Sequence, residues 1–267
     1  MIRSTIFTLF VVFTFNVIAH PKDGSPPFRT IEYEKAPYVI DLPEGDGPFP
    51  VIIYVHSWSG SHNQLRVYSQ RLASMGIAGD RIDYRKFSEG ASFAEASADL
   101  VAAIDFVRDH ANQFGFDLDK MGLAGASAGA VLSSRIVQDR PEIGLFIAFN
   151  GGFDMVDRGG GSFPSRANLE SMFGEVRPEV LEEHSAIHRL REKPPTTLLL
   201  HGTADDVIDP QQAVHFADAI RSAGGQAEVV LFEGEGHGFF NSNRPQFEEV
   251  YAEVERFVLE HFDLSAD

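Results

Sequence analysis

Residues 122–130 read GLAGASAGA, an apolar run that passes into small residues through the pattern Gly-x-Ser-x-Gly around Ser127. The run predicts a buried strand that turns sharply into a helix, because Gly125 and Gly129 allow a tight backbone turn at the serine. Such a turn exposes the Ser127 hydroxyl above the sheet, beside helix N–H groups that can hold a developing oxyanion. Glycine and serine are common, so the pattern alone also fits a small residue at a crowded helix–strand crossing.

Two downstream segments favour a catalytic role for Ser127. Residues 197–202 are an apolar strand-like run that leads into an acid-rich turn containing Asp205. Residues 227–232 form another such run, and His237 follows it. Both side chains are therefore expected just past the carboxyl ends of strands, where ligands bind in open α/β sheets.

The chain resembles α/β-hydrolase esterases of the acetyl-esterase kind, close to the feruloyl- or acetylxylan-esterase-like and dienelactone-hydrolase-like branches. Serine, acid and histidine stand in the chain order of that fold. The matching stretches are residues 52–56, 82–85, 125–129, 201–205 and 236–239. The resemblance implies an α/β fold with a mostly parallel central sheet, helices on both faces and a small insert before the acid-bearing strand.

The same resemblance implies a catalytic triad. Ser127 is the expected nucleophile, His237 the general base and Asp205 the acid that orients the histidine. Asp206 and Asp209 are nearby rivals, but Asp205 stands at the family position.

An oxyanion hole is expected between the start of the helix after Ser127 and the loop at residues 55–61. Relatives usually have glycine after the histidine of this loop, and this chain has Ser57 there. Serine tolerates a positive φ poorly, so the N–H of either Ser57 or Trp58 could point into the site. We favour Trp58, together with Ala128, the residue after the nucleophile.

The alternation of apolar runs predicts strands at residues 38–40, 51–55 and 145–149, and helices at residues 64–75 and 93–114. One segment does not fit this pattern. Residues 76–82 occupy a strand position yet contain Gly79, Asp80 and Arg81. A buried parallel strand should be apolar throughout, so this strand is expected to be short or near an edge.

Composition excludes several classes of protein. The chain has 267 residues, 43% of them hydrophobic, and a formal net charge of −17, which disfavours nucleic-acid binding. It has no cysteine, no P-loop and no dinucleotide glycine fingerprint, so we expect no cofactor. His184 and His188 stand four residues apart, but no third ligand accompanies them, and we expect no metal.

Residues 1–19 read as a signal peptide, with Arg3 before an apolar stretch and Ala19 at a small-residue cleavage site. The alternative is an anchor helix, for which the apolar stretch is short. We therefore expect residues 20–267 to form a single catalytic domain that is secreted or periplasmic and has no stable membrane anchor.

The predicted function is an exported serine carboxylic-ester hydrolase that cleaves short-chain acyl esters through an acyl-enzyme. Its expected partner is a small-molecule or polysaccharide ester, with acetyl or feruloyl carbohydrate esters suggested by the resemblance. Residues 150–195 are either a mobile flap or an ordinary connector. The alternative functions are a non-catalytic binding module of hydrolase fold and a serine peptidase of the prolyl-oligopeptidase type, which usually carries a large additional N-terminal domain.

Overall fold

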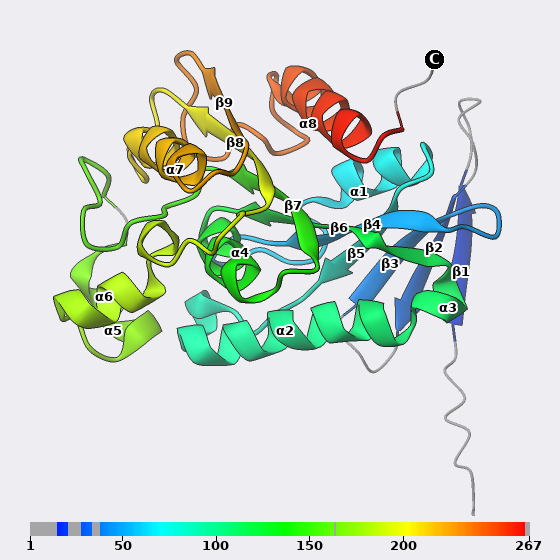
Figure 1. Ribbon diagram of the computed structural model, residues 1–267, viewed down its shortest axis with the longest axis horizontal. Coiled ribbons are helices and arrows are strands. Elements are labelled where there is room, and N and C mark those ends of the chain that lie inside the picture. The colour runs from blue at the N-terminus through cyan, green and yellow to red at the C-terminus, as the bar shows by residue number, and fades with distance from the viewer. Residues whose placement is uncertain (1–14, 21–27, 34–37, 163, 265–267) are drawn as a thin grey trace, which may run out of the picture.

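The computed structural model describes residues 15–20, 28–33, 38–162 and 164–264, which form a nine-stranded sheet with helices on both faces (Figure 1). The strand order is β1-β2-β3-β5-β4-β6-β7-β8-β9. The pairs β1–β2, β2–β3 and β3–β5 are antiparallel, and the remaining pairs are parallel. The strands are β1 (Phe15–His20), β2 (Phe28–Tyr33), β3 (Tyr38–Pro43), β4 (Phe49–Val55), β5 (Ala78–Ile82), β6 (Phe116–Ala126), β7 (Ile143–Phe149), β8 (Thr196–Gly202) and β9 (Ala227–Phe232). The mostly parallel sheet predicted from the sequence is confirmed.

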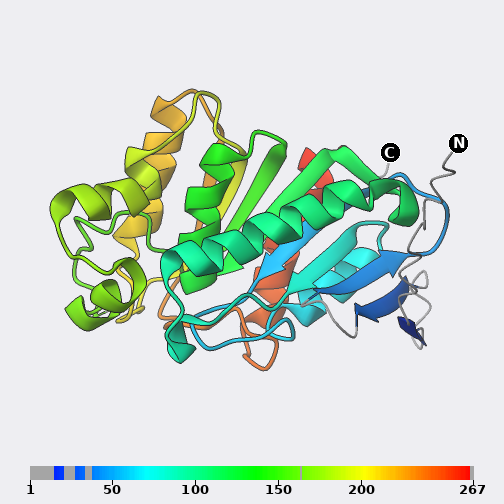
Figure 2. The same cartoon turned by 90° about the horizontal axis from the view of Figure 1, so that it is seen from below.

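The helices divide between two hydrophobic cores, one on each face of the sheet. Helices α1 and α8 pack on one face, and α2, α4 and α7 pack on the other (Figures 1 and 2). The bounds are α1 (Arg66–Ala73), α2 (Phe93–Asp109), α3 (Ala111–Phe114), α4 (Ala128–Asp139), α5 (Arg166–Phe173), α6 (Pro178–His184), α7 (Gln211–Ser222) and α8 (Phe247–His261), with short 3₁₀ turns η1 (Phe87–Glu89) and η2 (Ala186–His188). Helices α5 and α6 belong to the insert between β7 and β8.

The predicted helix over residues 93–114 is two helices. Ser92 and Glu95 form a capping box that begins α2. The helix ends at His110, whose Nδ1 donates to the carbonyl of Phe106 at 2.8 Å. That bond occupies a carbonyl of the last turn, and α3 follows as a separate short segment.

Strand β5 is short, as expected, but it is not near an edge. It lies between β3 and β4, and all five of its residues are buried. Arg81 is accommodated by Asp41 of β3, whose Oδ2 accepts from the Arg81 Nε at 2.7 Å. Of the two alternatives, the short strand is therefore confirmed, and an interior position is possible because a partner from a distant segment neutralises the buried charge.

Asp80 has no such compensation. Its side chain is fully buried, and neither carboxylate oxygen has a hydrogen-bond partner among the described residues. Burial raises the pKa of Asp80 to about 8; the nearby Asp41 adds to the rise and Arg81 opposes it. The folded protein therefore holds Asp80 protonated at neutral pH.

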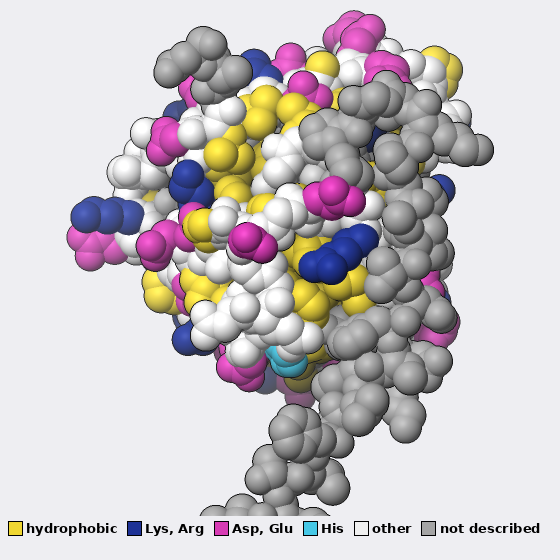
Figure 3. Space-filling view, turned by 90° about the vertical axis from the view of Figure 1, so that its right-hand side faces the viewer, with side chains coloured by type: hydrophobic (Ala, Val, Ile, Leu, Met, Phe, Trp, Pro, Cys, Tyr) yellow, Lys and Arg dark blue, Asp and Glu magenta, His cyan; other side chains and the backbone are white. Residues whose placement is uncertain are grey.

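Part of the predicted signal segment lies outside the described residues, namely residues 1–14. Its last five residues, 15–19, belong to β1, which pairs antiparallel with β2 from Phe15 opposite Tyr33 to His20 opposite Phe28. Among the described residues, no helix is long and apolar enough to cross a bilayer. Figure 3 faces the end of the molecule that carries β1, where acidic and basic side chains are scattered among hydrophobic ones.

The buried Asp80 predicts how stability depends on pH. The pKa of this carboxyl is near its ordinary value of 3.8 in the unfolded chain and about 8 in the folded one. Between these values the folded state binds the extra proton, so this group's contribution to stability is greatest below about pH 4 and is lost as the pH rises towards 8. Urea titrations at several pH values should show Asp80→Asn gaining stability relative to wild type as the pH rises through this window.

The exposed Asp46 supplies the control. Asp46→Asn should follow the wild-type curve at every pH. A constant difference between wild type and Asp80→Asn from pH 4.5 to 8 would show that Asp80 does not titrate in this way.

Candidate active site

Ser127 lies on a sharp turn between β6 and α4, with φ 51° and ψ −117°. This positive φ is strained for a residue with a side chain. The turn is held by the Ser127 N–H, which donates to the Phe149 carbonyl at 2.7 Å, and by the Ser127 carbonyl, which accepts from the N–H groups of Ala130 and Val131. The strand-to-helix turn predicted from the sequence is present.

The two glycines of the pattern are needed because backbones meet at this turn. A Cβ on Gly125 would lie 2.6 Å from the Gly129 carbonyl oxygen. A Cβ on Gly129 would overlap the His56 carbonyl at the end of β4. Any larger residue would push α4 away from β4, and Ser127 would move with it.

Three side chains from distant parts of the chain meet at the carboxyl edge of the sheet. Ser127 Oγ lies 3.0 Å from His237 Nε2, and His237 Nδ1 lies 2.8 Å from Asp205 Oδ2. Asp205 follows β8 and His237 follows β9, so neighbouring parallel strands deliver them to the same edge. The residues that the sequence proposed as a triad are therefore brought together in hydrogen-bonding order.

Asp205 is held as a carboxylate. Burial favours its neutral form, but hydrogen bonds from His201 and His237 outweigh that and, with the Ile208 N–H, keep the pKa of Asp205 well below its usual range. Its Oδ1 accepts from the N–H groups of Val207 and Ile208 at 2.9 and 3.0 Å. The carboxylate is thus fixed in position while its Oδ2 faces His237.

His201 is a contact that the sequence reasoning captured only in part. We interpret histidines at the start of such loops as hydrogen-bonding the loop backbone, and the His201 Nε2 does lie 3.0 Å from the Ile208 carbonyl. The same nitrogen also lies 3.1 Å from Asp205 Oδ2. Because both neighbours only accept, Nε2 carries the proton and adds a second histidine donor to the carboxylate.

The rival acids lie elsewhere. Asp206 is exposed. Asp209 Oδ2 accepts from the N–H of Gly160 at 2.7 Å, and its Oδ1 accepts from the N–H of Gln211 at 2.9 Å. These backbone bonds hold the pKa of Asp209 low. Asp209 thus ties the insert to the start of α7 and does not face the histidine.

A pocket of about 510 Å³ opens over Ser127 and His237. Its lining mixes aromatic and aliphatic side chains with hydroxyl and amide groups. The lining residues are Ser57, Trp58, Ser59, Gln64, Ser127, Asn168, Val207, His237, Gly238, Phe240 and Asn241. Asn168 comes from α5, so the insert forms one wall of the pocket.

The loop after β4 forms another wall, and its backbone is tightly bonded. The Ser57 N–H donates to Gln64 Oε1 at 2.8 Å, so it is already engaged. The Trp58 ring stacks on Phe87 with centroids 5.4 Å apart, and the Trp58 carbonyl accepts from the Ser88 N–H. Of the two loop N–H groups that the sequence left open, that of Ser57 is therefore committed to the Gln64 side chain.

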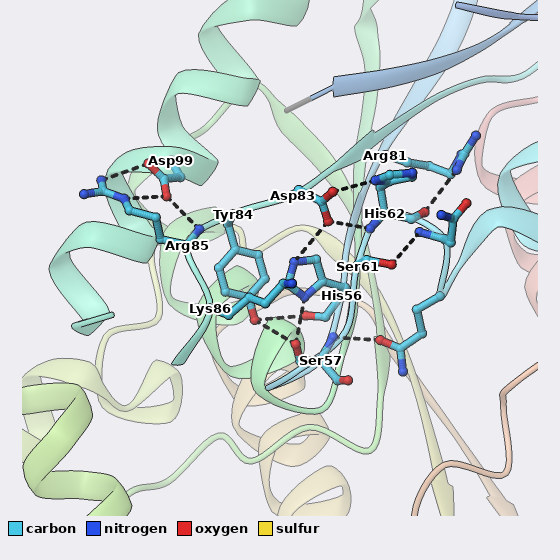
Figure 4. Close-up of polar contacts among 12 residues, drawn as sticks. His56, Ser57, Ser61, His62, Arg81, Asp83, Tyr84, Arg85, Lys86 and Asp99 are labelled. Atoms are coloured by element: carbon cyan, nitrogen blue, oxygen red, sulfur yellow. Dashed lines mark hydrogen bonds and ion pairs between the residues drawn. The ribbon is translucent and has the colours of Figure 1, made fainter. Parts of the chain in front are cut away.

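His56 lies beneath this loop (Figure 4). Its Nδ1 donates to the Ser57 carbonyl at 2.8 Å, and its ring stacks on Tyr84 at 4.1 Å. Burial lowers the pKa of His56, which favours the neutral ring. Tyr84 donates its hydroxyl to the carbonyls of His56 and Ser57, and Asp83 lies 2.5 Å from His62 Nδ1. Tyr84 and Asp83 fall in a stretch that supported the resemblance, but no pattern marked them as supports of the loop.

The two histidines of the insert, one in α6 and one in η2, contact different residues. His184 packs against the rings of Phe93 and Phe173, and His188 Nε2 lies 3.3 Å from Asp154 Oδ2. Among the described residues, the one group spaced as metal ligands is elsewhere, on β9 and α8, and consists of Glu228, Glu260 and His261. Arg256 forms ion pairs with both of those glutamates.

The chain is similar to known esterases in sequence. It is 29% identical over 219 residues to esterase LipC of Mycobacterium tuberculosis, covering 72% of this chain and 53% of that protein. It is 25% identical over 218 residues to an isoprenylcysteine alpha-carbonyl methylesterase of Arabidopsis thaliana, covering 72% and 51% respectively. The chain thus spans about half the length of the curated relatives it matches.

The structure is similar to Thermogutta terrifontis esterase 2, solved as the enzyme phosphonylated by sarin. The TM-score is 0.76 at 25% identity, and the match covers 95% of this chain and 97% of that one. This likeness confirms the α/β-hydrolase fold and the resemblance to serine esterases drawn from the sequence. A family model described as the prolyl oligopeptidase family matches residues 72–265, nearly three-quarters of the sequence, and the chain belongs to that family.

Proposed function

We propose that the protein is a serine carboxylic-ester hydrolase. The observation that carries this proposal is the unbroken chain of hydrogen bonds from Ser127 Oγ through His237 to Asp205, at the base of an open pocket. His237 Nε2 takes the Ser127 proton as Oγ attacks the ester carbonyl, and returns it to the leaving alkoxide. A water then attacks the acyl-enzyme by the same route and releases the acid.

Asp205 has a positioning and electrostatic part in this mechanism. It accepts the His237 Nδ1 proton, so Nε2 is left to face Ser127 as the base. The carboxylate also stabilises the imidazolium that forms as the serine attacks. Together with this bond, the contacts from His201 and two backbone N–H groups keep the carboxylate ionised.

The oxyanion that forms on the substrate needs donors beside Ser127. Ala128 is the first residue of α4, so its N–H belongs to the unpaired first turn of the helix. For the second donor we keep Trp58 of the loop after β4, the residue favoured from the sequence; the Ser57 N–H of the same loop is bonded to Gln64. Both groups are backbone donors, which are fixed in place before the reaction begins.

The pocket supports short acyl groups and a hydroxylated alcohol. Its volume of about 510 Å³ is modest, and amide or hydroxyl groups of Ser59, Gln64, Asn168 and Asn241 line it. The structurally similar Thermogutta terrifontis esterase 2 has been solved with propionate bound and with butyrate bound. Acetyl or feruloyl esters of carbohydrates, suggested by the resemblance, remain part of the proposal.

Two other functions compete with ester hydrolysis. The family takes its name from an oligopeptidase, so a serine peptidase using the same triad is the second candidate. A non-catalytic binding module is the third, and the intact geometry of Ser127, His237 and Asp205 speaks against it.

We further propose that the protein is exported, on the basis of the charged, then apolar, then small-residue pattern of residues 1–19. Cleavage after Ala19 would remove β1 apart from His20, and β2 would become the edge of the sheet. The parallel strands that carry Ser127, Asp205 and His237 lie far from that edge in the strand order, so the site would keep its framework.

A series of p-nitrophenyl esters from acetyl to palmitoyl tests the proposed reaction. We expect the highest kcat/KM at two to four acyl carbons, beside measurable release from acetylated xylan or a feruloyl ester. Ser127→Ala should lower kcat by about 10⁴- to 10⁶-fold, because the nucleophile is lost.

Other outcomes of this series are equally informative. An optimum at ten or more carbons would contradict the short-acyl proposal. Faster cleavage of a prolyl peptide anilide than of any ester would favour the peptidase, and no turnover of either would favour the binding module.

The acid of the triad is tested by a matched pair of substitutions. Asp205→Asn should lower kcat on the order of 10⁴-fold, since the amide cannot hold the required imidazole tautomer. Asp206→Asn, one residue away and exposed, should stay within about threefold of wild type. The reverse result would move the acid to Asp206 and leave the serine and histidine in place.

Export is tested by N-terminal sequencing and intact mass of the protein from cells that produce it. The mature chain should begin near His20 and lie outside the cytoplasm. Leu9→Arg, which interrupts the apolar stretch, should block this processing. Full-length protein retained in the membrane fraction would support the anchor alternative.

A further inference from the structure

The Gln64 side chain joins the two loops that flank Ser127. Its Oε1 accepts the N–H of Ser57 at 2.8 Å, and its Nε2 donates to Asn241 Oδ1 at 3.3 Å. Asn241 in turn donates to the carbonyl of Gly238, the residue after His237, at 2.8 Å. One neutral amide therefore connects the loop after β4 with the loop that carries the histidine.

The local sequence leaves room for this amide. A Cβ on Gly60 would lie 2.6 Å from Gln64 Oε1, so a side chain there would displace it. Gln64 also lines the pocket and precedes α1, which is packed into the core by Leu72. Its backbone is therefore held in place, and its side chain can hold both loops through the bonds to Ser57 and Asn241.

The other side of Ser57 is held as well. Its carbonyl accepts from His56 Nδ1 at 2.8 Å, from Tyr84 at 3.3 Å and from the N–H of Gly60 at 3.1 Å. Ser57 stands where relatives usually have glycine, but its φ is not positive, and its backbone is held by these contacts and by Gln64. Fixing both the N–H and the carbonyl of Ser57 fixes the orientation of the peptide that leads to Trp58.

We propose that Gln64 is a positioning residue for the oxyanion hole: by engaging the Ser57 N–H it fixes the loop after β4, and through Asn241 it keeps that loop in register with the loop that carries His237. This inference rests on the proposed ester hydrolysis. Oxyanion donors act only within about 2.7–3.1 Å of the developing charge. A misplacement of about 1 Å can cost on the order of 10²-fold in rate.

The test compares Gln64→Met, which keeps the length of the side chain and removes both hydrogen bonds, with Gln64→Asn, which keeps the amide but shortens its reach. Gln70→Met is the matched control. The Gln70 side chain is in α1, and among the described residues its recorded hydrogen bond is an exposed one, from Arg66. Melting curves establish that each variant folds. The readouts are kcat and KM for p-nitrophenyl butyrate, and inhibition constants for a trifluoromethyl ketone, which forms a tetrahedral adduct, and for butyrate.

Both Gln64 variants should lose about 10- to 100-fold in kcat with KM within about threefold of wild type. The inhibition constant of the trifluoromethyl ketone should rise by the same factor as kcat/KM falls, while that of butyrate stays nearly unchanged. Gln70→Met should match wild type in every measurement.

Three results would overturn the inference. Wild-type kcat in both Gln64 variants would show that the amide positions nothing. A rise in KM at constant kcat would make Gln64 a substrate-binding residue instead. Inactive wild-type protein would overturn the proposed function together with this inference, whereas the first two results leave ester hydrolysis standing.

Discussion

The close approach of the start of α4 to the end of β4 is the constraint on which the site depends. Gly129 lies against the His56 carbonyl, where no side chain fits. This contact places the Ser127 turn directly beside the loop that follows β4. Ser127, the first N–H groups of α4 and the loop after β4 therefore lie close together, and the positive φ of Ser127 is the strained backbone conformation that accompanies this arrangement.

Around this contact, several hydrogen bonds hold each polar group in place. The Asp205 carboxylate is held by two histidines and two backbone N–H groups, and the Ser57 peptide is held at both its N–H and its carbonyl. Groups held in this way need little rearrangement during a reaction, which is the basis of electrostatic preorganisation. His56 holds the Ser57 carbonyl with its Nδ1, and because burial lowers the pKa of His56, the neutral form of the ring is favoured.

The sheet shows two ways of burying an ionisable side chain. Arg81 is neutralised by Asp41, which also accepts from Thr30 and Ser69, so one carboxylate collects donors from three elements. Asp80, its neighbour on the other face of β5, has no donor and stays protonated. Both are compatible with an interior strand, but only the first is satisfied by hydrogen bonding.

The sequence by itself determined the order of strands and helices, the turn at Ser127, and the placement of Asp205 and His237 after strands, because these depend on local hydrophobic runs and glycines. It could not decide where β5 lies, since the partner that makes Arg81 tolerable stands forty residues away in β3. Nor could it divide the predicted helix at His110, the residue between α2 and α3, whose side chain bonds the Phe106 carbonyl. Nor could it show that the Ser57 N–H is engaged, because the acceptor is the Gln64 side chain and no motif marks that residue. Contacts between residues far apart in the sequence, or between a side chain and a particular backbone group, exist only once the chain has packed, and these decided the details of the site.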